Sequence, residues 1–264
     1  MTAAESFFVT CFGIRADIRV VALVGAGGKT SLMYRLAHEL NSTGRSVITT
    51  TSTKIFTPGP HQSPKLVLLS DEPKLEHLPK YLSKYRHLTL GESILPTGKV
   101  QGVTSPIIEQ CLNVADIVVL EADGAAGKSI KAPEDWEPVL PEMADLVIPV
   151  VGLDCIDRQA NSDTVFRLEC FLRVTGLKQG QTITPQVIGR LLAHPQGSLK
   201  NVPVTAAVVP YLNKLDMIKD ETILQEIIET AFSLSLGRIN KGAAGQLRER
   251  FDVKLILPIQ NKFT

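Results

Sequence analysis

Short apolar runs and stretches of helical period alternate along most of this sequence. Residues 20–24 form a β-branched apolar run, which is typical of a strand buried on both faces. A glycine turn follows, and then Leu32, Leu36 and Leu40 fall on one helical face. Further strands are predicted at 45–51, 65–70, 87–91, 116–121, 146–151, 204–212 and 253–257. This alternation predicts an α/β fold with a mainly parallel central sheet.

Helical patterns fill most of the segments between these runs. Helices are predicted at 1–14, 72–86, 105–115, 162–175, 184–193 and 223–231, with a last one near Gly245. We expect a single domain over residues 1–264, in which residues 152–200 form a small helical insertion.

Composition narrows the class of protein. The 264 residues are 44% hydrophobic and 21% charged, and 28 basic against 27 acidic residues leave a net charge of +1. This near-neutral charge therefore gives no indication that the protein binds nucleic acid. The N-terminal segment lacks the features of a signal peptide, and no apolar run approaches twenty residues, so we expect a soluble cytoplasmic protein without a membrane partner. The four cysteines form no C-x-x-C pair, which argues against a zinc site; Cys155, in a polar stretch, is the candidate for a reactive thiol.

The glycine turn carries the clearest chemistry. It reads Gly25-Ala26-Gly27-Gly28-Lys29-Thr30 and continues into Ser31. Glycines let the backbone approach a phosphate, the helix N-terminus attracts it, Lys29 adds positive charge, and Thr30 can place its hydroxyl on Mg²⁺. The pattern G-x-x-G-K-T is shorter than the standard phosphate loop, since Leu23 stands where the first glycine would be, and resembles the loop of Mur ligases. The competing interpretation is an ordinary glycine-rich turn.

Two carboxylates follow the apolar run 116–121. Glu121 ends this run and Asp123 comes two residues later. This is the Walker B pattern, in which an acid holds Mg²⁺ or orients a water molecule. Residues two apart on an extended segment point the same way, so both carboxylates are predicted to share one site. An acidic surface turn after a core strand remains the alternative.

Two polar segments are candidates for substrate binding. Residues 49–54 end a strand with five hydroxyls and a lysine, of which Thr51, Thr53 and Lys54 are the candidates. Because ligands of parallel sheets bind outside the carboxyl ends of strands, this run should lie beside the phosphate loop. The loop 124–141 adds Lys128 and Lys131, which could meet an anionic substrate. A solvated strand end and a solvated loop are the plainer alternatives.

The segment Asn213-Lys214-Leu215-Asp216 matches the N-K-x-D signature by which GTPases read guanine. The aspartate accepts hydrogen bonds from the base, and the lysine stem stacks on it. The segment follows a predicted strand, as this use requires. Alternatively, Asp216 and Asp220 act as N-cap residues for the next helix.

Taken in order, these motifs resemble the YqeC family. The matching segments are 24–30, 49–55, 120–125, Lys131-Ala132-Pro133, Glu137-Pro138 and 212–216. Ser52 interrupts the T-T-T-T-K-I run usual in that family. Members are described as accessory proteins for selenium-dependent molybdenum hydroxylases. The resemblance implies a nucleotide-binding cytoplasmic maturation factor, whose partners would be such a hydroxylase or its cofactor-maturation proteins.

Three functions fit these residues. The leading one is a Mg²⁺-dependent NTPase or phosphotransferase of three-layer P-loop fold that binds GTP or ATP. Lys29, Glu121 and Asp123 are its catalytic candidates, Thr30 and Glu121 its metal ligands, and residues 25–31 with Asn213, Lys214 and Asp216 its nucleotide site. The second is a Mur-like ligase or kinase whose acceptor is held by Lys128, Lys131 or the hydroxyls of 49–53. The third is a non-catalytic, nucleotide-gated chaperone that contacts the hydroxylase through loop 124–141.

Overall fold

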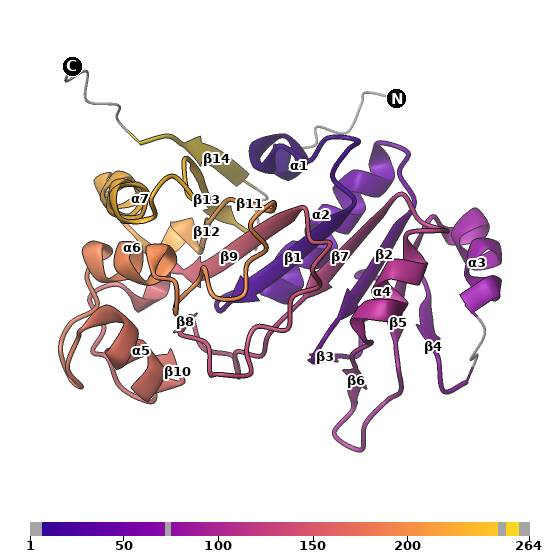
Figure 1. Ribbon diagram of the computed structural model, residues 1–264, viewed down its shortest axis with the longest axis horizontal. Coiled ribbons are helices and arrows are strands. Elements are labelled where there is room, and N and C mark those ends of the chain that lie inside the picture. Colours follow the sequence, from indigo (N-terminus) through magenta and orange to yellow (C-terminus); the bar gives the residue numbers. More distant parts are fainter. Residues whose placement is uncertain (1–6, 72–74, 248–251, 259–264) are drawn as a thin grey trace.

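A mainly parallel sheet of ten strands forms the middle layer of the protein (Figure 1). The computed structural model describes residues 7–71, 75–247 and 252–258. The strands of this sheet are β1 (Val20–Gly25), β2 (Val47–Thr51), β4 (Leu66–Leu68), β5 (His87–Gly91), β7 (Ile117–Glu121), β9 (Leu146–Gly152), β11 (Ala207–Val208), β12 (Tyr211–Asn213), β13 (Gly242–Gln246) and β14 (Asp252–Ile256). Their order is β14-β13-β12-β9-β1-β7-β2-β5-β4, with β11 beside β9, and β14 pairs antiparallel with β13 whereas the other pairs are parallel.

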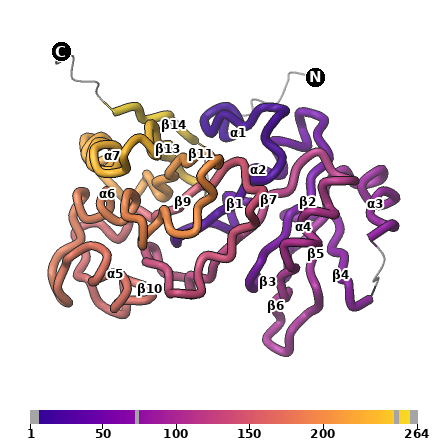
Figure 2. Tube along the Cα trace, viewed as in Figure 1, coloured from indigo at the N-terminus to yellow at the C-terminus, as the bar shows by residue number. Residues whose placement is uncertain are grey.

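Helices cover both faces of this sheet. Alternate residues of β1 point to opposite faces: Val21 and Leu23 pack under α1 (Phe7–Phe12) and α2 (Lys29–Ser42), while Val20 and Ala22 face the other side. That second face is covered by α3 (Leu78–Tyr85), α4 (Ser105–Cys111), α6 (Pro185–Ala193) and α7 (Thr222–Leu234). The path of the chain through the three layers can be followed in Figure 2. The three-layer α/β fold with a mainly parallel sheet is thus confirmed.

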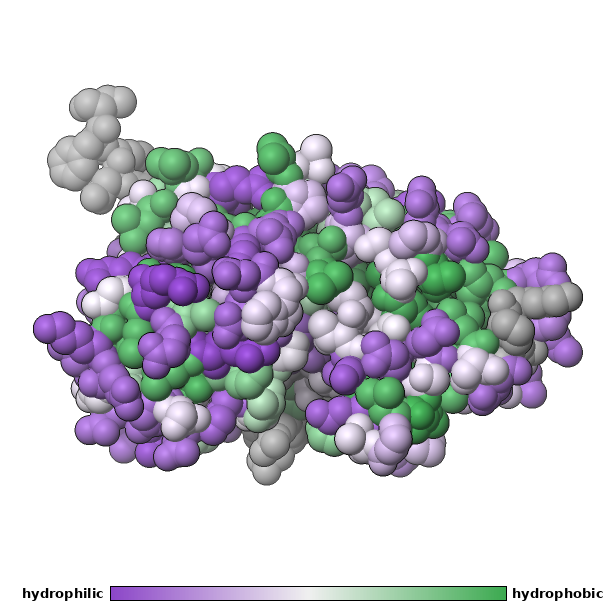
Figure 3. Space-filling model, turned by 60° about the horizontal axis from the view of Figure 1, so that its bottom comes forward, coloured by the Kyte–Doolittle hydropathy of each residue, from purple (hydrophilic) through white to green (hydrophobic). Residues whose placement is uncertain are grey.

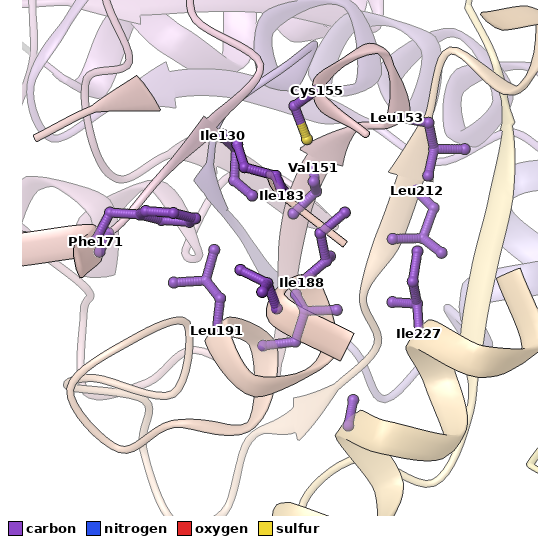
Figure 4. Packing of buried hydrophobic residues seen from close by; sticks show 14 of the residues in the cluster. Ile130, Val151, Leu153, Cys155, Phe171, Ile183, Ile188, Leu191, Leu212 and Ile227 are labelled. Carbon is purple, nitrogen blue, oxygen red and sulfur yellow. The ribbon is translucent and has the colours of Figure 1, made fainter. Parts of the chain in front are cut away.

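A second core cluster joins the segment 152–200 to the sheet (Figure 4). Phe171 from α5 (Leu168–Thr175) and Ile188 from α6 pack with Val151 of β9 and Leu212 of β12. Ile227 of α7 completes this group. The helices of 152–200 therefore share one apolar core with the sheet, and their description as an insertion stays a prediction.

Short pairings connect the loops that surround the site. β3 (Lys54–Phe56) pairs antiparallel with β6 (Lys99–Gln101), and β8 (Ile130–Lys131) pairs in parallel with β10 (Val165–Phe166). Three 3-10 turns complete the elements: η1 (Leu75–His77), η2 (Leu153–Cys155) and η3 (Leu215–Met217). Residues 72–74 of the predicted helix 72–86, and residues 1–6 of the predicted helix 1–14, lie outside the described ranges.

One predicted helix is wrong, and another is too long. The helix expected near Gly245 is strand β13, whose glycines permit close contact: a Cβ on Gly245 would lie 2.0 Å from the carbonyl oxygen of Asp252 in β14. The helix expected at 162–175 begins only at Leu168, because Val165 and Phe166 pair with β8 instead. Both errors involve strand partners, β12 for β13 and β8 for β10, that lie far away in the sequence.

Within the described ranges, no helix is both long enough and apolar enough to cross a membrane. The face that is lowest in Figure 1 is shown in Figure 3, where hydrophilic surface is interrupted by separate hydrophobic patches.

Candidate functional site

The glycine loop lies at the centre of the sheet, between β1 and the start of α2. Gly25, Gly27 and Gly28 have φ of 91°, 87° and 133°, which L side chains rarely adopt. Space is also lacking, since a Cβ on Gly27 would lie 2.4 Å from the backbone nitrogen of Gly152, and one on Gly28 would lie 2.1 Å from Nδ2 of Asn213. The loop is therefore packed tightly against the backbone of Gly152 and the side chain of Asn213, as a close phosphate cradle requires.

Lys29 is the first residue of α2, and its side chain is almost fully enclosed. The residue is 3% exposed. Its Nζ donates to the carbonyl oxygen of Gly25 and lies 3.1 Å from Oδ1 of Asp123 and 3.6 Å from Oε1 of Glu121. Burial opposes the positive charge, but the two carboxylates outweigh it and raise the pKa of Lys29. The ammonium therefore stays charged, with acidic partners around it.

The two carboxylates come from the strand next to the loop. β7 pairs directly with β1, with Glu121 opposite Leu23. Oε2 of Glu121 accepts a 2.7 Å hydrogen bond from the hydroxyl of Thr30, and Oδ2 of Asp123 accepts one of 3.0 Å from the Gly25 nitrogen. Burial raises the pKa of Glu121. Glu121 and Asp123 thus lie together against the loop, as their spacing predicts.

The hydroxyls of the run 49–53 are largely engaged within the sheet. Thr51 donates to the carbonyl oxygen of Glu121 (2.7 Å) and accepts from the nitrogen of Thr53 (3.0 Å). Thr49 is within 3.1 Å of Nε2 of His87, whose burial lowers its pKa to about 4 and keeps the ring neutral. Lys54 is exposed on β3. Thr51 therefore lies beside the acidic strand end, but as a strand-bridging hydroxyl.

The two lysines of the loop 124–141 have different surroundings. Lys128 is partly exposed, and its Nζ donates to the carbonyl oxygen of Asp163 at 2.7 Å. Lys131, in β8, is 3% exposed and lies 3.1 Å from Oδ2 of Asp123 and 2.7 Å from Oε2 of Glu137. Only Lys131 of these two reaches the carboxylates at the loop.

The N-K-x-D segment meets the phosphate loop from the other side. Nδ2 of Asn213 donates to the carbonyl oxygen of Gly27 at 2.7 Å. Lys214 has a φ of 64°, and its Nζ donates to Oγ of Ser129 (2.8 Å) and pairs with Oδ2 of Asp154 (2.7 Å). The segment is thus physically joined to the glycine loop, as a base-reading segment would be.

The alternative role of this segment, capping α7, can be tested directly. Asp220 accepts a 2.9 Å hydrogen bond from the nitrogen of Thr222 at the start of the helix. Asp216 lies earlier, in η3, with its side chain exposed. Asp220, one residue before the N-cap position Glu221, therefore binds the first residue of the helix, and Asp216 takes no part in this contact.

Sequence reasoning missed two residues of this site. Ser129 and Asp154 bind the ammonium of Lys214, and neither belongs to a motif. Asp154 did carry a signal, because it follows β9, and polar residues after parallel strands gather at the ligand edge of a sheet. Ser129 carried no such signal, since the position of its side chain depends on how the loop 124–141 folds.

The expectation of a reactive Cys155 is wrong. The residue is 1% exposed, and burial raises the pKa of its thiol. Asp157 and Arg158 are exposed, whereas Cys155 packs in the core of Figure 4. Among the described residues, no group of three or more histidines, cysteines and acids is placed to hold a metal ion.

The fold and the site define a three-layer α/β protein with a phosphate-loop-like turn at the centre of its sheet. A family model described as YqeC protein matches residues 21–169. The chain is also 32% identical over 228 residues to Uncharacterized protein YqeC of Escherichia coli (strain K12), with 85% of this chain and 87% of that protein covered. The chain therefore belongs to the YqeC family, which confirms the resemblance.

Two solved structures match most of this chain at low similarity. FtsY from Mycoplasma mycoides matches 92% of this chain and 65% of its own, with a TM-score of 0.37 and 13% identity. Signal recognition particle receptor FtsY from Elizabethkingia anophelis matches 89% of this chain and 62% of its own, with a TM-score of 0.36 and 13% identity. The chain spans less than two thirds of each FtsY chain.

Proposed function

We propose that this protein binds GTP or ATP with Mg²⁺ at residues 25–31 and hydrolyses it or transfers its terminal phosphoryl group. The observation that carries the proposal is the enclosed Lys29 ammonium with the carboxylates of Glu121 and Asp123 beside it. A turn with no ligand has no need for a buried lysine opposite two acids, since burying charge is costly. The β- and γ-phosphates would pair with the Lys29 ammonium in place of these carboxylates.

The residues around Thr30 fit a magnesium ion. Its hydroxyl oxygen and the Glu121 carboxylate are 2.7 Å apart, and both are the hard oxygen ligands that Mg²⁺ prefers. Bound Mg²⁺ would offset the negative charge of the triphosphate. Asp123, held by the Gly25 nitrogen, would accept the proton of the attacking water or acceptor hydroxyl. Lys214 and Asp216 would read a guanine base.

We further propose that the reaction serves maturation of a selenium-dependent molybdenum hydroxylase in the cytoplasm, with that hydroxylase or its cofactor-maturation proteins as partners. Membership of the YqeC family supports this role. No observation favours the ligase or kinase hypothesis: Lys131 and the hydroxyl of Thr51, both proposed to hold its acceptor, are engaged by the protein's own groups.

Phosphate release tests the chemical step. With Mg²⁺ and GTP or ATP, the wild type should release phosphate, and chelation of Mg²⁺ should stop it. Asp123→Asn should slow release by about 100-fold or more, as expected for loss of a general base, because the amide cannot take the proton. The matched control is Asp135→Asn, which removes an exposed carboxylate elsewhere and should leave the rate unchanged. Release by Asp123→Asn at the wild-type rate would rule out the assigned base.

A further inference from the structure

Charged side chains of alternating sign form a continuous series from the surface to the phosphate loop. Nη2 of Arg167 lies 3.8 Å from Oε1 of Glu137, whose Oε2 lies 2.7 Å from Nζ of Lys131. Lys131 lies 3.1 Å from Oδ2 of Asp123, and Oδ1 of Asp123 lies 3.1 Å from Nζ of Lys29. Arg167 is partly exposed, while the other four residues are buried. We call these five residues the charge series.

Lys131 is fully occupied within this series. An ammonium group has three N–H donors, and Nζ of Lys131 has three acceptors: the carbonyl oxygen of Gly124 at 2.8 Å, Glu137 and Asp123. All three contacts of Lys131 are within 3.1 Å, whereas one of the three contacts of Lys29, to Glu121, is longer at 3.6 Å. The geometry of Lys131 therefore suits a residue that holds Asp123 in place, rather than one that binds a ligand.

Lys29, at the inner end of the series, is the member that a triphosphate would affect. A phosphate beside its ammonium competes with Asp123 for the same charge. Such competition is strong where water is excluded, because charge interactions grow as the dielectric falls. Lys131 would then become the main counter-charge of Asp123. Because Lys131 would be drawn toward Asp123, Glu137 would turn toward Arg167, the other cation beside it.

The outer end of the series touches the protein's single tryptophan. The guanidinium carbon of Arg167 lies 5.4 Å from the ring centre of Trp136 and 4.7 Å from that of Phe166. Trp136 is 65% exposed. A small displacement of the guanidinium would therefore change both the surroundings of the indole and the surface it presents.

We propose that Lys131 is a positioning residue that couples the phosphate loop to the surface around Trp136. On one side it holds Asp123; on the other it acts through Glu137 and Arg167. Ion-pair networks with two arrangements can carry coupling of this kind between distant groups. The inference rests on the proposed triphosphate binding. It predicts that the surface of the loop that carries Trp136 differs between the free and the bound protein.

The test measures binding and the tryptophan signal separately. The full chain is titrated with Mg²⁺-GTP, Mg²⁺-ATP and Mg²⁺-tripolyphosphate, which lacks a base that could quench the indole. Heat of binding and Trp136 fluorescence are recorded at each step. In the wild type, both should saturate at the same ligand concentration. Glu137→Gln, which keeps the side-chain shape but removes the charge, should bind with a Kd within about threefold of wild type and lose the fluorescence change.

Asp135→Asn is the matched control, because it removes a charge next to Trp136 that lies outside the series; its fluorescence change should persist. If Glu137→Gln fails to fold, Lys131→Met/Glu137→Gln removes one charge of each sign and leaves no unpaired lysine. Binding heat without a fluorescence change in the wild type, or a full change in the folded variant, would overturn the coupling and leave the proposed function standing. No heat with any of the three ligands would overturn both.

Discussion

The two sides of the candidate site are built differently. On the phosphate side, Lys29 at the start of α2, Glu121 at the end of β7 and Asp123 just after it are buried and held by Gly25 and Thr30. On the base side, the pair of Lys214 and Asp154 is about one-third exposed. Buried charges must be satisfied for the protein to fold, whereas exposed pairs contribute little to stability. Variants on the phosphate side should therefore change folding and binding together, and variants on the base side should change binding alone.

Gly28→Ala should have the largest effect on stability and binding, because Gly28 lies where the phosphate side and the base side of the site are in contact. The substitution places a Cβ at a φ of 133° and 2.1 Å from Nδ2 of Asn213. We expect the free energy of unfolding to fall by about 2–4 kcal/mol from backbone strain and overpacking, with loss of triphosphate binding. Chemical denaturation and calorimetry measure the two effects.

Gly44→Ala supplies the matched control at the other end of α2. Gly44 also has a positive φ, of 91°, but a Cβ there meets nothing within 4 Å. Its cost should be only about 1 kcal/mol, the strain of the backbone alone. If Gly28→Ala were no less stable than Gly44→Ala, the close contact between the phosphate loop and Asn213 would be refuted.

Asp216→Asn should have a smaller and purely functional effect. The side chain is exposed, so the free energy of unfolding should change by less than about 0.5 kcal/mol. GTP affinity should fall by about 10- to 100-fold through loss of charged hydrogen bonds, and preference should shift toward xanthine nucleotides. Competition binding measures this shift. Asp220→Asn, just before the N-cap of α7, should leave the preference unchanged. An unchanged preference in Asp216→Asn as well would refute the assigned base reader.

The same contrast explains what the sequence could and could not predict. The strand before Lys29 and the strand before Asp123 are short apolar runs, and parallel strands bring their carboxyl ends to one edge, so the meeting of these motifs was predictable. The partners of Lys131 and Lys214 were not, because Glu137 and Ser129 lie in a loop whose path depends on tertiary contacts.

The helix predicted in place of β13 and the reactive thiol predicted at Cys155 fail for a related reason. The small residues of β13 show no strand pattern, and only the neighbouring β14 and α7 reveal why small residues stand there. Cys155 shows the same effect at a single residue: Asp154, Asp157 and Arg158 lie near it in the sequence, but its neighbours in space are apolar. Long-range packing, which local pattern does not record, decides both cases.

Triphosphate binding to the wild type and to Lys29→Met tests the central claim most directly. Methionine keeps most of the side chain's apolar length and removes the charge, and circular dichroism establishes that the variant is folded. Calorimetry with Mg²⁺-GTP and Mg²⁺-ATP should show saturable binding by the wild type and at least about 100-fold weaker binding by the variant, equivalent to about 3 kcal/mol. Equal binding by a folded Lys29→Met protein would contradict the account.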